Sequence, residues 1–321
     1  MLMTFEQLKR SATQDIVSTL SEEWEVKEIS VQKHNREGLT GLTFMQKGSN
    51  GGPTIYAENI YDLYMHGVPY EELIKGLTKS IEDSCKIYRQ LQGFFEELTF
   101  EKVKANLRLR ICDKKINEEL LKPLVYREIG GGIVITVDIN YESATARVTR
   151  DHLDMLGVTE DDLFKEAMSY QVNAAEPVLV PIEEAMTFGG PKEASQRIGN
   201  FLQQEAPLNP DQLLVLTNTN DLNGAVALSY PGILEKITDL MGGDFFILPS
   251  SIHEVLIIGT GKRGRAAKLQ ETIHSANSNV VSADEILSDS LFICKNGKLE
   301  RVPSKTGGEA WSASRICFPQ M

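Results

Sequence analysis

Hydrophobic residues recur at helical spacing in several parts of the chain. Phe5, Leu8 and Ala12 fall on one side of a helix, which predicts an amphipathic helix near the amino terminus. Thr149 and Thr159 precede two later helical stretches and are predicted N-caps, because their hydroxyl oxygens can accept the free first-turn amides. Further helices are predicted over residues 54–66, 70–81, 99–111, 150–156, 160–172, 232–241 and 265–276.

Alternation of polar and apolar positions predicts strands elsewhere. Residues 24–34 and 38–47 alternate on either side of a turn-prone segment, which favours a β-hairpin, and Asn296-Gly297 predicts a second one. Residues 244–249 and 254–259 are joined by a turn too short for a crossover helix, so these two strands are expected to pair antiparallel. Other strands are predicted over residues 125–141, 143–149, 212–219, 224–231 and 278–282, with 212–219 paired to 224–231.

Strands and helices therefore interleave with several hairpins. This order predicts an α+β fold with mixed, largely antiparallel sheets and packed helices. At 321 residues the chain is long enough for two domains. We expect an amino-terminal hairpin–helix domain over residues 1–95 and an α+β domain over residues 96–302. Residues 187–212 are expected to form a long connection and residues 303–321 a loose tail.

Charge and cysteine content narrow the function classes. The formal net charge of −12 disfavours a nucleic-acid partner, and no apolar run approaches the ~18 residues that span a bilayer. The charged amino terminus is unlike a secretory signal, so we expect a cytoplasmic protein. The four cysteines form no CxxC pair and no HExxH motif occurs, so we expect neither a metal nor a cofactor. A protein partner or a second copy of the chain remains open.

Basic residues gather between Lys102 and Lys115, and this segment fits two interpretations. On the predicted helix they would form one face able to hold phosphate or RNA. The segment lacks interleaved aromatic residues, however, and a solvated helix face explains the charges as well.

A glycine-rich loop follows the predicted strand 254–259. Gly259, Gly261 and Gly264 precede a helix, and Asp284 lies 20 positions after Gly264, near the spacing at which an acid binds a ribose. Too few residues remain after this loop for the second half of a dinucleotide-binding fold, and the preceding strand has an antiparallel neighbour. Dinucleotide or anion binding at residues 259–264 is therefore an alternative, and a surface loop is the preferred interpretation.

The segment PSSIHE brings hydroxyl, imidazole and carboxylate groups within six residues. A hydrolase would use Ser250 or Ser251 as nucleophile and His253 as base, with Glu254 or Asp289 as the orienting acid. The alternative is a structural turn, because serines in turns commonly bond the local backbone.

Several stretches resemble a known family, among them GPTIYAENIYDLYMHG, VTRDHLDMLGVTEDDLFKEAM, PSSIHE and LSDS. They are similar to domain-of-unknown-function family 5688, an uncharacterised family of Firmicutes, over about residues 3–302. A Bacillus-type uncharacterised family is a more distant resemblance. Neither resemblance implies an activity or any catalytic residue. It implies a cytoplasmic bacterial protein, which we interpret as a binding or regulatory module, with the hydrolase as the alternative.

Overall fold

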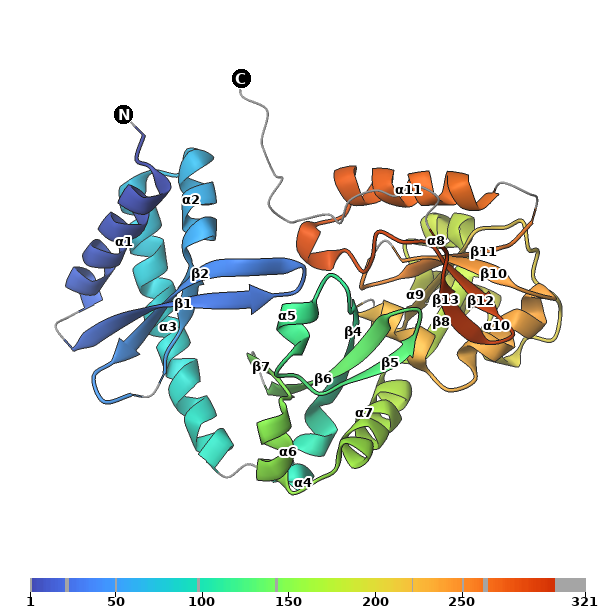
Figure 1. Ribbon diagram of the computed structural model, residues 1–321, viewed down its shortest axis with the longest axis horizontal. Helices are drawn as coiled ribbons and strands as arrows, with labels where there is room; N and C mark the ends of the chain where they lie inside the picture. The colour runs from blue at the N-terminus through green and yellow to red at the C-terminus, as the bar shows by residue number, and fades with distance from the viewer. Residues whose placement is uncertain are drawn as a thin grey trace. The chain divides into compact units, whose positions relative to one another are not determined.

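A computed structural model describes residues 2–20, 23–49, 51–96, 99–141, 144–220, 222–249, 251–261 and 265–303 (Figure 1). The chain divides into two compact units, Met1–Leu98 and Thr99–Met321. The α+β class predicted from the sequence is confirmed, because both units combine helices with mainly antiparallel sheets.

The first unit is a small antiparallel sheet covered by helices. Its elements are α1 (Phe5–Leu20), β1 (Trp24–Lys33), β2 (Arg36–Gln46), β3 (Thr54–Tyr56), α2 (Ala57–Met65) and α3 (Tyr70–Glu96). The strand order is β1-β2-β3. The predicted hairpin is confirmed, and Asn35 at its turn has a φ of 57°. Residues 54–56, predicted as the start of a helix, instead pair with β2 as a third strand.

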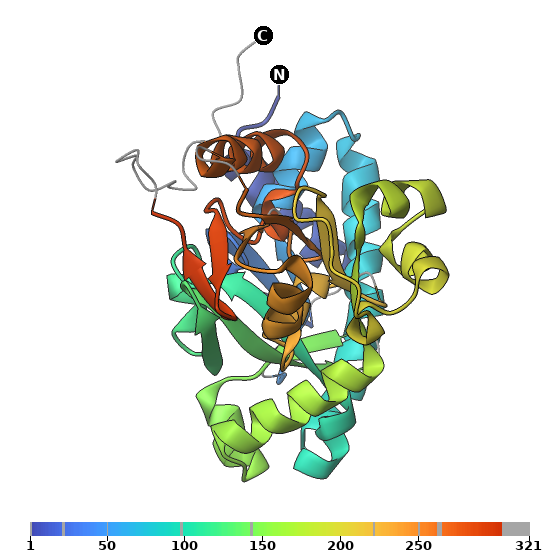
Figure 2. The same cartoon turned by 90° about the vertical axis from the view of Figure 1, so that its right-hand side faces the viewer.

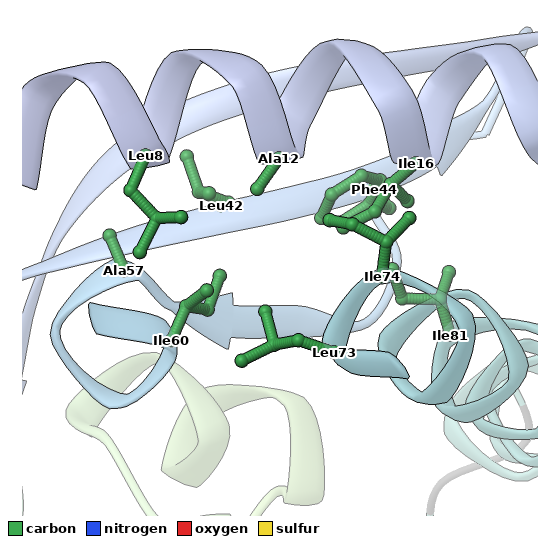
Figure 3. Packing of buried hydrophobic residues seen from close by; sticks show 10 residues of the cluster. All are labelled: Leu8, Ala12, Ile16, Leu42, Phe44, Ala57, Ile60, Leu73, Ile74 and Ile81. Atoms are coloured by element: carbon green, nitrogen blue, oxygen red, sulfur yellow. The ribbon is translucent and has the colours of Figure 1, made fainter. Parts of the chain in front are cut away.

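One hydrophobic cluster holds this unit together. Leu8, Ala12 and Ile16 are spaced along one side of α1 and are essentially buried. Figure 3 shows them pointing toward Leu42 and Phe44 of β2 and toward side chains of α2 and α3. The helical spacing read from the sequence thus defines the inner face of α1.

The second unit is built on one ten-stranded sheet. Its strands are β4 (Leu107–Asp113), β5 (Tyr126–Gly130), β6 (Ile133–Tyr141), β7 (Ala144–Arg147), β8 (Pro177–Pro181), β9 (Leu214–Asn218), β10 (Phe245–Leu248), β11 (Val255–Gly259), β12 (Phe292–Lys295) and β13 (Lys298–Arg301). They are ordered β4-β6-β5-β13-β12-β10-β11-β9-β8, and β7 also pairs with β6. The β13–β5 contact is parallel and the other pairings are antiparallel.

Helices cover this sheet on both faces. They are α4 (Phe100–Val103), η1 (Lys104–Asn106), α5 (Glu118–Leu121), α6 (Arg150–Leu156), α7 (Glu160–Ala174), α8 (Ile182–Phe188), α9 (Pro191–Ile198), η2 (Phe201–Gln203), η3 (Gly224–Ser229), α10 (Ile233–Met241), α11 (Arg265–Asn279) and η4 (Ala283–Glu285). Ile273 of α11 packs with Phe246 and Leu248 of β10, while Thr238 of α10 approaches Cys294 of β12. In Figure 2 the red β12–β13 hairpin stands beside the green strands β4 to β6.

Two local predictions agree with the structure in detail. The β12–β13 hairpin turns at Asn296-Gly297, where both residues have positive φ as a tight hairpin turn requires. Thr159 caps α7, because its Oγ1 accepts the amide of Asp162 at 3.1 Å. Thr149 precedes α6 as predicted, and its backbone amide donates to Nδ1 of His152 at 3.1 Å.

Four segment predictions in the second unit were wrong. Residues 107–113 form strand β4 instead of the end of a helix, because they pair with β6 along their whole length. Residues 125–141 form a hairpin that turns at Gly131-Gly132, not one strand. Residues 224–229 form η3, since both edges of β9 are already paired, and residues 278–279 end α11.

The long connection predicted over residues 187–212 contains the short helices α9 and η2. Most of the tail predicted over residues 303–321 lies outside the described residues.

Candidate functional site

The PSSIHE turn is held by backbone hydrogen bonds from two directions. The amide of Ile252 donates to the carbonyl of Glu285 at 2.8 Å, and the amide of Ser288 donates to the carbonyl of Pro249 at 3.0 Å. On the other side, the amide of Ala225 donates to the carbonyl of Ile252. The turn between β10 and β11 therefore lies between η3 and the segment 283–288. PSSIHE and LSDS, two of the stretches on which the family resemblance rests, meet here.

The hydroxyl of Ser251 is committed to this turn. Its Oγ accepts the backbone amide of His253 at 3.0 Å, a local arrangement typical of serine in turns. The described contact between Ser251 and His253 is thus to the backbone nitrogen and not to the imidazole. Ser250, the other predicted nucleophile, lies outside the described residues.

The imidazole of His253 is oriented by groups that the sequence did not suggest. Its Nδ1 accepts the backbone amide of Asn223 at 3.2 Å, so in the neutral ring the proton lies on Nε2. Nε2 lies 3.6 Å from Oε1 of Glu285, and 28% of the His253 side chain is exposed. Glu285 faces the ring because the segment 283–288 folds back onto the turn, which no local pattern reveals.

Asp289, one of the two acids predicted to orient His253, has another hydrogen-bond partner. Asp289 Oδ1 accepts the side-chain amide of Asn277 on α11 at 2.7 Å. Glu254 directly precedes β11, where successive side chains point to opposite faces of the strand. The carboxylate nearest the ring in the described contacts is that of Glu285.

Close backbone approach fixes the neighbouring loop. Asn223, the residue before Gly224, has left-handed backbone geometry with a φ of 51°. A Cβ at Gly224 would lie 1.9 Å from Oγ1 of Thr217 and 2.4 Å from the carbonyl oxygen of His253. Since Thr217 Oγ1 donates to that same carbonyl at 2.8 Å, only glycine leaves room for this hydrogen bond.

Beneath the turn lies a buried polar network. Ser288 is fully buried and donates to Oδ2 of Asp113 at 2.5 Å. Arg301 Nη2 donates to the same oxygen at 3.0 Å, and its Nη1 donates to Oγ of Ser290 at 2.7 Å. Asp113 Oδ1 accepts the amide of Lys115 at 2.9 Å. Both Asp113 oxygens are thus satisfied, and the network joins the end of β4 to β13 and the LSDS segment.

The described start of the glycine-rich loop is held by hydrogen bonds at Gly259. Gly259 ends β11, which lies between β10 and β9 and is antiparallel to both. The antiparallel pairing of β10 with β11 was predicted from their short connection. Its amide donates to the carbonyl of Pro210, and its carbonyl accepts Nη1 of Arg265, both at 2.8 Å. Gly261 has a φ of 53°, while Gly264 lies outside the described residues. Gly259 is required by the close approach of Pro210, whose oxygen would be 2.7 Å from a Cβ.

Neither a metal-ligating cluster nor a membrane-spanning helix occurs among the described residues. Among the described residues, no three or more His, Cys, Asp or Glu side chains are grouped so that they would hold a metal ion. Within the same part of the chain, every helix is too short or too polar to cross a membrane.

Comparison with known proteins gives one match. The model of a family described as "Family of unknown function (DUF5688)" matches residues 5–295. No curated protein matches the chain. No solved structure matches it either. Because the family model covers most of the chain, the protein belongs to this family of unknown function.

Proposed function

We propose that the protein is a cytoplasmic binding or regulatory module that recognises its partner through the turn surface, defined here as Ser251, His253 and Glu285. The observation that carries this proposal is the orientation of His253. Its Nδ1 is fixed by a backbone amide, and its Nε2 is directed toward a half-exposed carboxylate. A preoriented donor and acceptor on a fixed backbone suit recognition of a polar group.

Two features support binding over hydrolysis. The Ser251 hydroxyl serves the backbone of the turn, and the buried Ser288 is hydrogen-bonded to a carboxylate, not to an imidazole. Nucleophilic catalysis requires a serine within hydrogen-bond reach of a base. The described serines of the turn and of LSDS have no such contact with His253.

Thermal-shift measurements test the proposal. Purified protein is screened against amino acids, nucleotides and sugars, since a ligand that binds only the folded state raises the melting temperature. Size-exclusion chromatography with light scattering tests whether a second copy is the partner. In each case His253→Ala and Glu285→Gln are compared with Glu271→Gln, an exposed change on α11.

The proposal expects a stabilising ligand or self-association that is weakened by both turn variants and retained in Glu271→Gln. Ester or peptide hydrolysis by the wild type that disappears in a Ser250→Ala/Ser251→Ala double variant would overturn it in favour of the hydrolase. A ligand or dimer unaffected by His253→Ala and Glu285→Gln would place recognition elsewhere and also overturn it.

A further inference from the structure

The arginines of β4 lie on one face of the sheet. Register pairs Arg110 with Thr136 and Arg108 with Asp138, and β7 pairs Arg147 with Asp138 from the other side. Directly paired residues of antiparallel strands share a face. These five residues are called the arginine face below. Within the basic segment 102–115, Arg108 and Arg110 thus lie on a sheet surface, whereas Lys102 lies in α4 and Lys104 in η1.

Asp138 is the buried centre of this face. Its side chain is 1% exposed, and its Oδ2 accepts Nε of Arg110 at 2.5 Å. Its Oδ1 is buried and accepts no hydrogen bond from any residue that the structure describes. A buried carboxylate oxygen without a donor is costly, so it marks a position where a donor from outside the chain would bind favourably.

Arg110 is held in a way that leaves its outer nitrogens available. The ion pair with Asp138 uses Nε, while Nη1 and Nη2 donate to none of the described residues. The Arg110 side chain is 37% exposed. A guanidinium positioned through Nε presents its two Nη groups as a planar fork, the geometry that suits carboxylate and phosphate oxygens.

Thr136 adds a hydroxyl beside this fork. The residue is 5% exposed, and its Oγ1 makes no hydrogen bond within the described part of the chain. Arg108, by contrast, is occupied: its guanidinium lies over the ring of Tyr170 at 4.3 Å and donates to the carbonyls of Ala105 and Leu107. The groups that converge without partners are therefore Arg110 Nη, Thr136 Oγ1 and Asp138 Oδ1.

We propose that the arginine face binds a small organic anion that also carries a hydroxyl group, such as a hydroxy acid or a phosphorylated polyol. The Nη groups of Arg110 and the hydroxyl of Thr136 donate to the anionic oxygens. Oδ1 of Asp138 accepts the ligand hydroxyl. This site uses β4, β6 and β7, none of which contributes to the turn surface, and it does not depend on the proposed function.

Charge supports an anionic ligand. Arg110 and Arg147 flank Asp138, so these three residues carry a net positive charge although the whole chain has a formal charge of −12. Asp138 in turn selects against a simple inorganic anion, because its second oxygen repels negative charge and requires a donor. The two features together specify an anion with a neighbouring hydroxyl.

Isothermal titration calorimetry of the full chain tests the site with four probes. Glycerol 3-phosphate and glycolate each carry an anionic group and a hydroxyl. The anionic group is a phosphate in the first and a carboxylate in the second. Sulfate carries the anion alone, and glycerol carries the hydroxyl alone. We expect one or both of the first two to bind at least about tenfold more tightly than sulfate or glycerol, the effect of one charge-assisted hydrogen bond.

Two conservative variants remove single ligand contacts while keeping the charge or the shape of the side chain, so that loss of binding is distinguished from misfolding. Arg110→Lys retains the charge beside Asp138 but loses the fork, and Thr136→Val preserves shape while removing the hydroxyl. Arg127→Gln is the matched control, since Arg127 pairs with Ile135 on the opposite face and contacts Phe164 and Asp161. We expect about a tenfold loss of affinity in Arg110→Lys and a smaller loss in Thr136→Val, with Arg127→Gln unchanged.

Circular dichroism confirms that each variant is folded before titration. Absence of binding by both glycerol 3-phosphate and glycolate would overturn the proposal. Equal affinity for sulfate, or binding that persists in folded Arg110→Lys and Thr136→Val, would overturn it as well, because the ligand would then interact through charge alone or at another surface. His253→Ala should leave this binding unchanged, which separates failure of this site from failure of the turn surface.

Discussion

Replacing Ser288 with alanine tests whether the buried network holds the second unit together. Ser288 Oγ donates to Asp113 and accepts the amide of Ser290 at 3.2 Å. Arg301 Nη1 also approaches Ser288 Oγ at 3.4 Å, so the hydroxyl stands between the carboxylate and the guanidinium. In Ser288→Ala the buried Asp113 loses one of its donors, while Arg301 and the amide of Lys115 remain.

The expected cost follows from these contacts. A hydrogen bond to a charged group contributes about 1.5–3 kcal/mol, and removing one hydroxyl oxygen creates almost no cavity. Ser288 is 0% exposed, so water does not replace the lost donor without rearrangement. We therefore expect Ser288→Ala to lower the free energy of unfolding of the second unit by about 2–3 kcal/mol.

Urea unfolding followed by far-UV circular dichroism measures this change. The transition of the second unit should move by about 1 M urea, given the usual dependence of stability on denaturant. Hydrogen exchange detected by mass spectrometry assigns the change, with faster exchange expected in peptides covering β4 and the β12–β13 hairpin. Exchange in peptides from Met1–Leu98 should be unaltered, because that unit has its own core.

Ser282→Ala is the matched control for Ser288→Ala. Ser282 is an exposed serine that precedes η4 without a side-chain capping bond, so its loss should cost less than about 0.5 kcal/mol. If Ser288→Ala were as mild as Ser282→Ala, the network would not stabilise the fold and the assignment of Ser288 to a structural role would be refuted.

Four further predictions address other parts of the second unit. Gly224→Ala should break the Thr217–His253 hydrogen bond and destabilise the unit by more than about 2 kcal/mol in urea unfolding; a wild-type midpoint would contradict the close approach. Thr159→Ala should cost about 1 kcal/mol through loss of the α7 cap, whereas Thr159→Ser should cost less. Burial raises the pKa of the Cys112 thiol to about 12, so iodoacetamide at about pH 8 should label Cys112 in urea and leave it unlabelled in the native protein, as peptide mass spectrometry would show. Burial also raises the pKa of Asp138 above its ordinary 3.8, despite the attraction of Arg110 and Arg147. The folded state therefore binds this proton more tightly than the unfolded chain does, and stability is lost as pH rises from that ordinary value through the raised pKa. Asp138→Asn should remove this loss, and unfolding curves whose pH dependence matches the wild type would contradict the assignment.

Sequence patterns determined the elements whose signals are local. Spacing of Leu8 and Ala12 defines α1, Thr159 fixes the start of α7, and Asn296-Gly297 fixes the β12–β13 turn. In each case the residues that form the structure are neighbours along the chain, so side-chain spacing, capping and positive φ act without reference to the rest of the fold.

Residues 107–111 show where local signals conflict. Leu107 and Ile111 fit both a helical face and an alternating strand, since Leu109 supplies the intermediate position of the strand pattern. In the folded protein these residues form a strand, because β6 supplies hydrogen-bonding partners along their whole length. Residues 224–229 show the opposite outcome: they were predicted as a strand but form the helical turn η3. Their predicted partner β9 already pairs with β8 and β11 on its two edges.

The sequence also identified two segments that meet at the candidate site, PSSIHE and LSDS. Only the tertiary structure decided their partners: Ser288 binds Asp113 across 175 residues of chain, and the ring of His253 faces Glu285, while Asp289 binds Asn277. Periodicity and capping report contacts within a few residues, whereas these pairings arise from the order of strands in the sheet. That order depends on long-range burial and hydrogen bonding, which no local pattern encodes.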